Sequence, residues 1–218
     1  MRGIGSSKRV LDPIDRVSEI LFGLIMVLTL TGSLSVAEAG RADVREMLLG
    51  ALGCNLIWGV IDGIFYLMGC LAERGRGLMT FLAVRKATDP ATAQQLIAGT
   101  LPPLVASVLQ PAELESLRVR LTALPEPPKR ARLPKEDWLG AVGVFLLVFL
   151  STLPVVIPFT FMKDVNFALR ISNAVAIVIL FAMGYTFGQL TGRRPMWAGI
   201  VMVVFGAILV SATIALGG

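Results

Sequence analysis

Long apolar runs alternate with polar segments along this chain. Five runs are long enough to cross a bilayer as α-helices, because a span needs about 20 residues at 1.5 Å of rise each. They occupy residues 17–37, 47–71, 138–161, 167–189 and 196–216. The first run also resembles a signal peptide followed by a cleavage site at Ala37-Glu38-Ala39, but it is longer than a typical signal core and carries Glu19 near its start. We therefore predict an all-α, polytopic membrane protein with five transmembrane helices.

A charged, proline-containing segment, residues 72–137, separates the second predicted span from the third. Thr88-Asp89-Pro90 places a capping side chain before a proline, and residues 111–115 place acids in a first helical turn. An apolar face at helical spacing is formed by Leu114, Leu117, Leu121 and Leu124. We predict a small soluble insert of two or three short helices, which ends in an extended linker over residues 125–137.

The distribution of basic residues predicts the orientation of the chain. Of the 20 Lys and Arg residues, sixteen lie in the N-terminal segment, the insert and the loop at 193–194, whereas only four lie on the other side. Positively charged loops stay in the cytosol. We therefore expect four segments: a cytosolic N-terminal segment (1–16), two spans (17–71), a cytosolic helical insert with its linker (72–137) and three spans (138–218). The C-terminus is expected on the opposite side of the membrane.

The composition excludes several classes of protein. Hydrophobic residues make up 55% of the chain and charged residues 16%, which favours lipid over water as the solvent. The net charge of +5 is explained by topology, so no nucleic-acid partner is expected. There is no histidine, and Cys54 and Cys70 lie too far apart on one predicted helix for a disulfide. No nucleotide loop, nucleophilic triad or cysteine metal motif is present, so we expect neither an enzyme nor a resident cofactor.

Polar residues inside the first two predicted spans are the candidates for chemistry. Asp62 lies deep in the second span and Glu19 near the cytosolic start of the first. Counting residues from the span ends places Met26 opposite Asp62. On a helical wheel, Glu19 shares one side of its span with Met26, and Asn55 shares one side of the other span with Asp62. Carboxylate, amide and thioether groups suit borderline divalent metals, and carboxylates also exchange protons.

Each of these candidates also has a purely structural interpretation. Asp62 can be a protonated carboxyl that bonds to another helix, and Glu19 can be an acid favoured in a first helical turn. Met26 can be a packing residue. Gly59 and Gly63 form a GxxxG pair, which is typical of close helix contact within a bundle or a dimer.

Several motifs resemble one family. Pro154 and Pro158, which we expect to bend or break the third span, resemble its C-terminal signature together with residues 190–195, Leu-Thr-Gly-Arg-Arg-Pro, before a glycine-containing last span. Ser18-Glu19 before an apolar run with Gly32-Ser33 is similar to its first-span segment. The chain thus resembles the vacuolar iron transporter family of ferrous and manganous ion exporters. That resemblance implies a dimer, proton-coupled export and an ion path near the first two spans.

The chain also departs from that family's pattern. The family has an aspartate where Glu19 stands, so a carboxylate is retained. The family's second-span methionine corresponds to Gly63 and its glutamate to Leu67, while Asp62 supplies an acid one position away. The family's insert is often rich in glutamate, whereas the insert of this chain is largely basic.

The leading hypothesis is a divalent metal transporter that exports iron or manganese from the cytosol in exchange for protons. Glu19, Met26, Asn55 and Asp62 are its predicted metal-path residues. The expected partners are the lipid bilayer, the metal ion, protons and a second copy of the chain. The lack of an organellar signal favours a bacterial plasma membrane. The alternative is a non-transporting scaffold whose basic insert, with a cluster at residues 129–132, binds a protein partner or anionic lipid.

Overall fold

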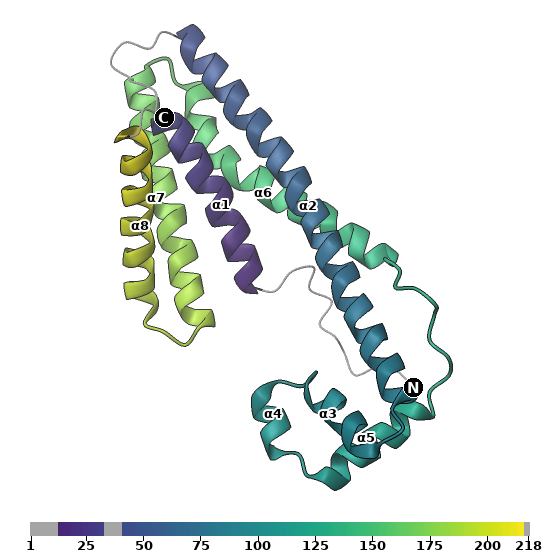
Figure 1. The fold of residues 1–218 in the computed structure, drawn as a ribbon. Helices are drawn as coiled ribbons and strands as arrows, with labels where there is room; N and C mark the ends of the chain where they lie inside the picture. The colour runs from purple at the N-terminus through teal and green to yellow at the C-terminus, as the bar shows by residue number, and fades with distance from the viewer. Residues whose placement is uncertain (1–12, 33–40, 216–218) are drawn as a thin grey trace. The chain divides into compact units, whose positions relative to one another are not determined.

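The computed structural model describes residues 13–32 and 41–215, and every regular element in these ranges is a helix (Figure 1). The helices are α1 (Pro13–Gly32), α2 (Arg41–Lys86), α3 (Pro90–Ala98), α4 (Pro103–Val108), α5 (Pro111–Thr122), α6 (Lys135–Phe161), α7 (Val165–Leu190) and α8 (Pro195–Ala215). The predicted all-α class is confirmed for the described residues.

Four helical stretches in the described ranges are long and apolar enough to cross a membrane. They are Val44–Lys86, Lys135–Phe161, Val165–Leu190 and Pro195–Ala212. Helix α1 adds a shorter apolar stretch, Val17–Met26. The last part of the first predicted span, residues 33–37, lies outside the described residues. Four spans are therefore present by length and composition, and the fifth stays a prediction.

Helix α2 is longer than the sequence pattern predicted. The second span was expected to end at residue 71, but the helix continues without interruption to Lys86. The change at Ala72 is a change of polarity more than of helix-forming tendency, because most of residues 72–86, apart from Gly75 and Gly77, are of types that favour helices and the next proline is Pro90. Backbone contacts divide the chain into two units, residues 67–134 and the remainder, so the boundary falls inside α2.

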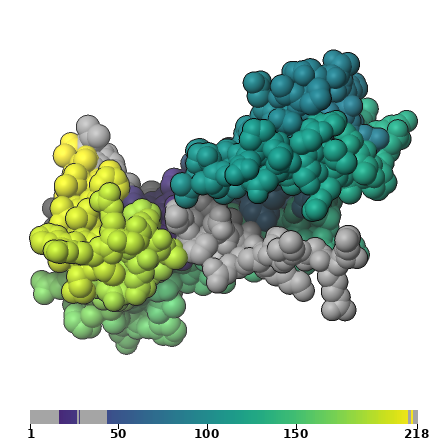
Figure 2. Space-filling model, turned by 90° about the horizontal axis from the view of Figure 1, so that it is seen from below, coloured from purple at the N-terminus to yellow at the C-terminus, as the bar shows by residue number. Residues whose placement is uncertain are grey.

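In the membrane unit, α1 packs on α6, α7 and α8, and α7 packs on both α6 and α8. The buried core is formed by Leu24, Leu28, Val155, Val156, Ala176 and Leu180. Glycines allow the closest approach: a Cβ atom at Gly184 of α7 would lie 2.6 Å from the Ala198 carbonyl oxygen of α8. Helices α7 and α8 therefore form one continuous surface in the space-filling view (yellow-green and yellow in Figure 2).

Helix α6 contains both predicted helix-breaking prolines, Pro154 and Pro158, and continues to Phe161. The helix is therefore not interrupted at either proline. Proline removes one backbone hydrogen bond, and neighbouring helices can offset that loss in a membrane. The Ser172 hydroxyl of α7 donates to the Val155 carbonyl oxygen of α6 at 2.7 Å and so links the two helices beside the first proline.

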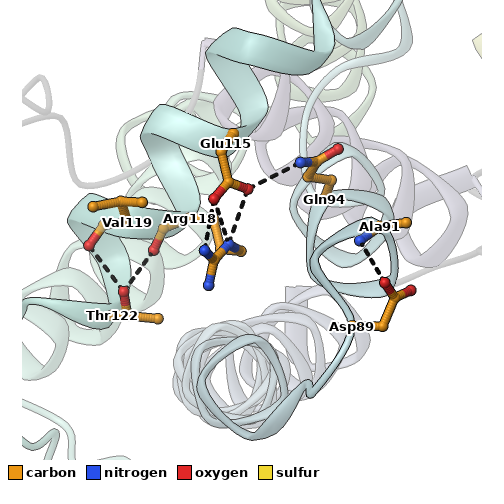
Figure 3. Close-up of polar contacts among 7 residues, drawn as sticks. All are labelled: Asp89, Ala91, Gln94, Glu115, Arg118, Val119 and Thr122. Atoms are coloured by element: carbon orange, nitrogen blue, oxygen red, sulfur yellow. Dashed lines mark hydrogen bonds and ion pairs between the residues drawn. The ribbon is translucent and has the colours of Figure 1, made fainter.

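The unit formed by residues 67–134 contains the short helices. Asp89 caps α3, as its sequence signature predicted. It accepts hydrogen bonds from the Ala91 amide (Figure 3) and from the Thr92 amide. Helix α5 begins at Pro111, with a capping box between Gln110 and Glu113. Its apolar face packs on the buried side chains of α3 and on Val84 through the following residues: Leu114, Leu117 and Leu121.

Two predictions about the end of this unit were wrong. Leu124 was assigned to the apolar face of α5, but the helix ends at Thr122 and the Leu124 side chain is 49% exposed. The extended linker was expected to reach residue 137, but α6 already begins at Lys135. Glu136 and Asp137 lie in the first turn of α6, where acids are favoured by the helix dipole.

Candidate functional site

Side-chain contacts fix how α1 and α2 lie against each other. The rings of Phe22 and Trp58 meet edge to face with centroids 5.2 Å apart. One turn further along α1, the Cys54 thiol lies 3.7 Å from the Met26 sulfur. A step of four residues forward on α1 thus matches a step of four residues back on α2, which is the register of an antiparallel helix pair.

The same register brings two carboxyl groups together. The side chains of Glu19 and Asp62 interact directly, and the Oδ2 atom of Asp62 is buried without a hydrogen-bond partner in the described part of the chain. Adjacent carboxyl groups in apolar surroundings do not both hold a negative charge unless a proton or a cation compensates for it. This pair is therefore suited to binding one or the other.

The predicted pairing of Asp62 with Met26 differs from the structure. That pairing was obtained by counting from span ends at residues 17 and 71. Both helices extend beyond these ends, since α1 begins at Pro13 and α2 continues to Lys86. The register is set by side-chain packing, which places Glu19 beside Asp62 and Met26 beside Cys54.

Asn55, the third predicted polar residue, is fully buried and faces α6. Its Nδ2 donates to the Val148 carbonyl oxygen at 3.1 Å and to the Thr152 hydroxyl at 2.7 Å, while its Oδ1 has no partner among the described residues. Asn55 lies seven residues from Asp62, which is about 10.5 Å of helical rise. The amide therefore holds α2 against α6 and does not join the carboxyl pair.

The glycine pair continues this contact between α2 and α6. A Cβ atom at Gly59 would lie 3.2 Å from the Phe145 carbonyl oxygen, and one at Gly63 would lie 3.2 Å from the Ala141 carbonyl oxygen. The contact within the bundle is thus the structural role that the GxxxG spacing indicated. The full stripe, Asn55 with both glycines at intervals of four, is visible in the sequence, but only the structure shows that α6 is its partner.

The four predicted metal-path residues do not form one cluster around a common point. In the described ranges, no group of three or more His, Cys, Asp and Glu side chains is placed to hold a metal ion. Glu19 and Asp62 form one pair, Met26 lies beside Cys54, and Asn55 bonds to α6. The sequence analysis did not predict a role for Cys54, because the two cysteines were considered only as partners in a disulfide. That Cys54 lies beside Met26 follows from the helix register, which only the structure shows.

These features define a helical membrane protein with two partly buried acidic side chains between its helices, as in membrane transporters for cations. The model of the VIT family matches residues 89–218, more than half of the chain. The chain therefore belongs to the VIT (vacuolar iron transporter) family, whose members transport metal ions and are not enzymes. No curated protein matches it. The matched range covers α6, α7 and α8 but not α1 or α2. The assignment of Glu19 and Asp62 as a site is therefore supported by the geometry of the structure and not by the family match.

Proposed function

We propose that this protein exports iron or manganese from the cytosol in exchange for protons, and that Glu19 and Asp62 bind the ion and the proton in turn. The observation that carries the proposal is the direct interaction of these two carboxyl groups between α1 and α2. Membership of the VIT family supports metal-ion transport. The choice of ion, the proton coupling and the direction of transport are our proposals.

The exchange follows from the charge of the pair. With both carboxyl groups ionised, Glu19 and Asp62 attract a divalent cation, and the buried Oδ2 of Asp62 has a free lone pair for it. Protons that arrive from the opposite side neutralise the carboxylates and release the cation. Since the pair binds either the metal or protons, each ion moved outward is linked to protons moved inward. Asn55 supports this cycle by holding α2 on α6.

The proposed topology rests on the distribution of basic residues. We place the N-terminus and residues 72–137 in the cytosol and the C-terminus on the opposite side, because these segments and the loop at 193–194 carry sixteen of the 20 basic residues. A homodimer in a bacterial plasma membrane completes the proposal. The scaffold alternative is not favoured, because the members of the family are transporters.

Transport into proteoliposomes tests the proposal. Vesicles containing the purified protein should accumulate Fe²⁺ or Mn²⁺ only when a pH gradient is imposed, as read by an encapsulated metal-sensitive dye. Asp62→Asn and Glu19→Gln should each lower the initial rate at least about tenfold, since a charged ligand and proton carrier is lost. Asp164→Asn is the matched control, because Asp164 caps α7 through the Phe167 amide and asparagine caps equally well.

Two results would refute the proposal. Undiminished transport by Asp62→Asn would remove this carboxyl from the mechanism. Metal uptake by the unaltered protein at the same rate without a pH gradient would remove the exchange with protons.

A further inference from the structure

A sulfur pair lies next to the carboxyl pair along the same two helices. The Cys54 thiol of α2 and the Met26 thioether of α1 are 3.7 Å apart. Cys54 lies eight residues from Asp62, which is about 12 Å of helical rise toward the start of α2. We propose that these two sulfur atoms form a second metal site, which binds a soft or borderline cation such as Cu⁺, Cd²⁺, Zn²⁺ or Fe²⁺.

The distance between the sulfur atoms suits one bridging ion. Metal–sulfur bonds to ions such as zinc are about 2.3 Å long, so an ion bonded to two sulfurs 3.7 Å apart has an S–metal–S angle of about 107°. This angle is close to that of a tetrahedral site.

Open space surrounds the thiol on its own helix. A Cβ atom at Gly50 or Gly53, within one turn of Cys54, would meet no other atom within 4 Å, and the Cys54 side chain is itself exposed. The thioether of Met26 is half-buried against α2. A further ligand can therefore complete the coordination shell on the open side.

The chemistry of the ligands defines the class of ion. A thiolate and a thioether select soft and borderline metals, whereas Mg²⁺ and Ca²⁺ prefer oxygen ligands. Binding forms a metal–sulfur bond at Cys54 and releases the thiol proton to water, so the affinity falls as the pH falls. As a second binding site on the ion pathway that contains Glu19 and Asp62, the sulfur pair selects transition metals. This role rests on the proposed function, but the binding site itself does not.

Cadmium binding to the purified full-length protein tests the site. A cadmium–thiolate bond adds an ultraviolet charge-transfer absorption, which a titration follows. We expect one cadmium–thiolate bond per chain in the unaltered protein and in Cys70→Ser, which is the matched control. Cys54→Ser should form no such bond with the affinity of the unaltered protein. Met26→Leu should weaken the affinity at least about tenfold, because one ligand is lost. Met68→Leu, at an exposed methionine on the same helix as Cys54, should leave the affinity unchanged.

The outcomes separate this site from the proposed function. Equal cadmium absorption in Cys54→Ser, or an unchanged affinity in Met26→Leu, overturns the sulfur site. Absorption that persists in Asp62→Asn while metal transport is lost supports two separate sites. An unaltered protein that shows the absorption but moves no metal across vesicles refutes the transport proposal and leaves the sulfur site in place.

Discussion

The bonds from Asn55 to α6 predict a specific energetic coupling between α2 and α6. The Asn55 amide donates to the Thr152 hydroxyl at 2.7 Å and to the Val148 carbonyl oxygen at 3.1 Å, and all three residues are fully buried or nearly so. Replacing Asn55 with alanine removes both bonds and a longer one, of 3.4 Å, to the Phe149 carbonyl oxygen. Replacing Thr152 with valine removes the hydroxyl while it keeps the volume. The two substitutions together therefore isolate the bond between the side chains.

The magnitude follows from measured bonds between membrane helices. Such hydrogen bonds contribute about 0.6 kcal/mol on average and at most about 1.7 kcal/mol. Asn55→Ala should therefore lower the free energy of unfolding by about 1–2 kcal/mol for the lost bonds, with an additional cost from the cavity. The loss of the unpartnered Oδ1 offsets part of this cost. The coupling energy between Asn55→Ala and Thr152→Val should be about 0.6–1.7 kcal/mol.

The assay is a double-mutant cycle measured by reversible unfolding of the purified protein in mixed micelles. A control cycle pairs Asn55→Ala with Thr160→Val, because the Thr160 hydroxyl bonds within α6 to the Ile157 carbonyl oxygen and is exposed. The control cycle should show no coupling. Additive effects of Asn55→Ala and Thr152→Val would refute the reasoning. So would unchanged stability of Asn55→Ala together with lost metal transport, because Asn55 would then act as a metal ligand and not as a helix contact.

Two further predictions concern helix packing and pH. Gly184→Ala should lower the free energy of unfolding by about 1–3 kcal/mol, because its Cβ would lie 2.6 Å from the Ala198 carbonyl oxygen. The control Gly50→Ala, where the Cβ enters open space, should be neutral or stabilising. Equal melting temperatures of the two variants would contradict this prediction. The hydrogen bonds from Arg118 and then Gln94 lower the pKa of Glu115 from its ordinary value of 4.5 to about 2. The stabilising effect of these hydrogen bonds is therefore complete above pH 4.5 and is lost as the pH falls through about 2. Protection of α5 from protease in the full chain should decline in that pH window, and the decline should be less steep in Glu115→Gln. The same decline in both proteins would contradict this prediction.

Local signals in the sequence were sufficient to predict the positions of the membrane helices α6, α7 and α8 and the starts of α3 and α5 in the insert. Apolar run length predicted the membrane helices α6, α7 and α8 to within a few residues, because the bilayer thickness fixes the length of a span. Asp89 before Pro90 predicted the start of α3, since capping depends on adjacent residues. The end of α2 was missed because polarity reports the solvent around a helix and not where the helix stops.

By itself, the sequence therefore determined the helical class, the separation of an insert from the membrane helices and the identity of the acids inside the spans. The tertiary structure decided which side chains meet. It placed Asp62 beside Glu19, Cys54 beside Met26 and Asn55 on α6. Run lengths leave the sliding and rotation of one helix against another undetermined by a turn or more. Ring contacts, glycine contacts and buried hydrogen bonds then select one register, and that register forms the carboxyl pair and the sulfur pair.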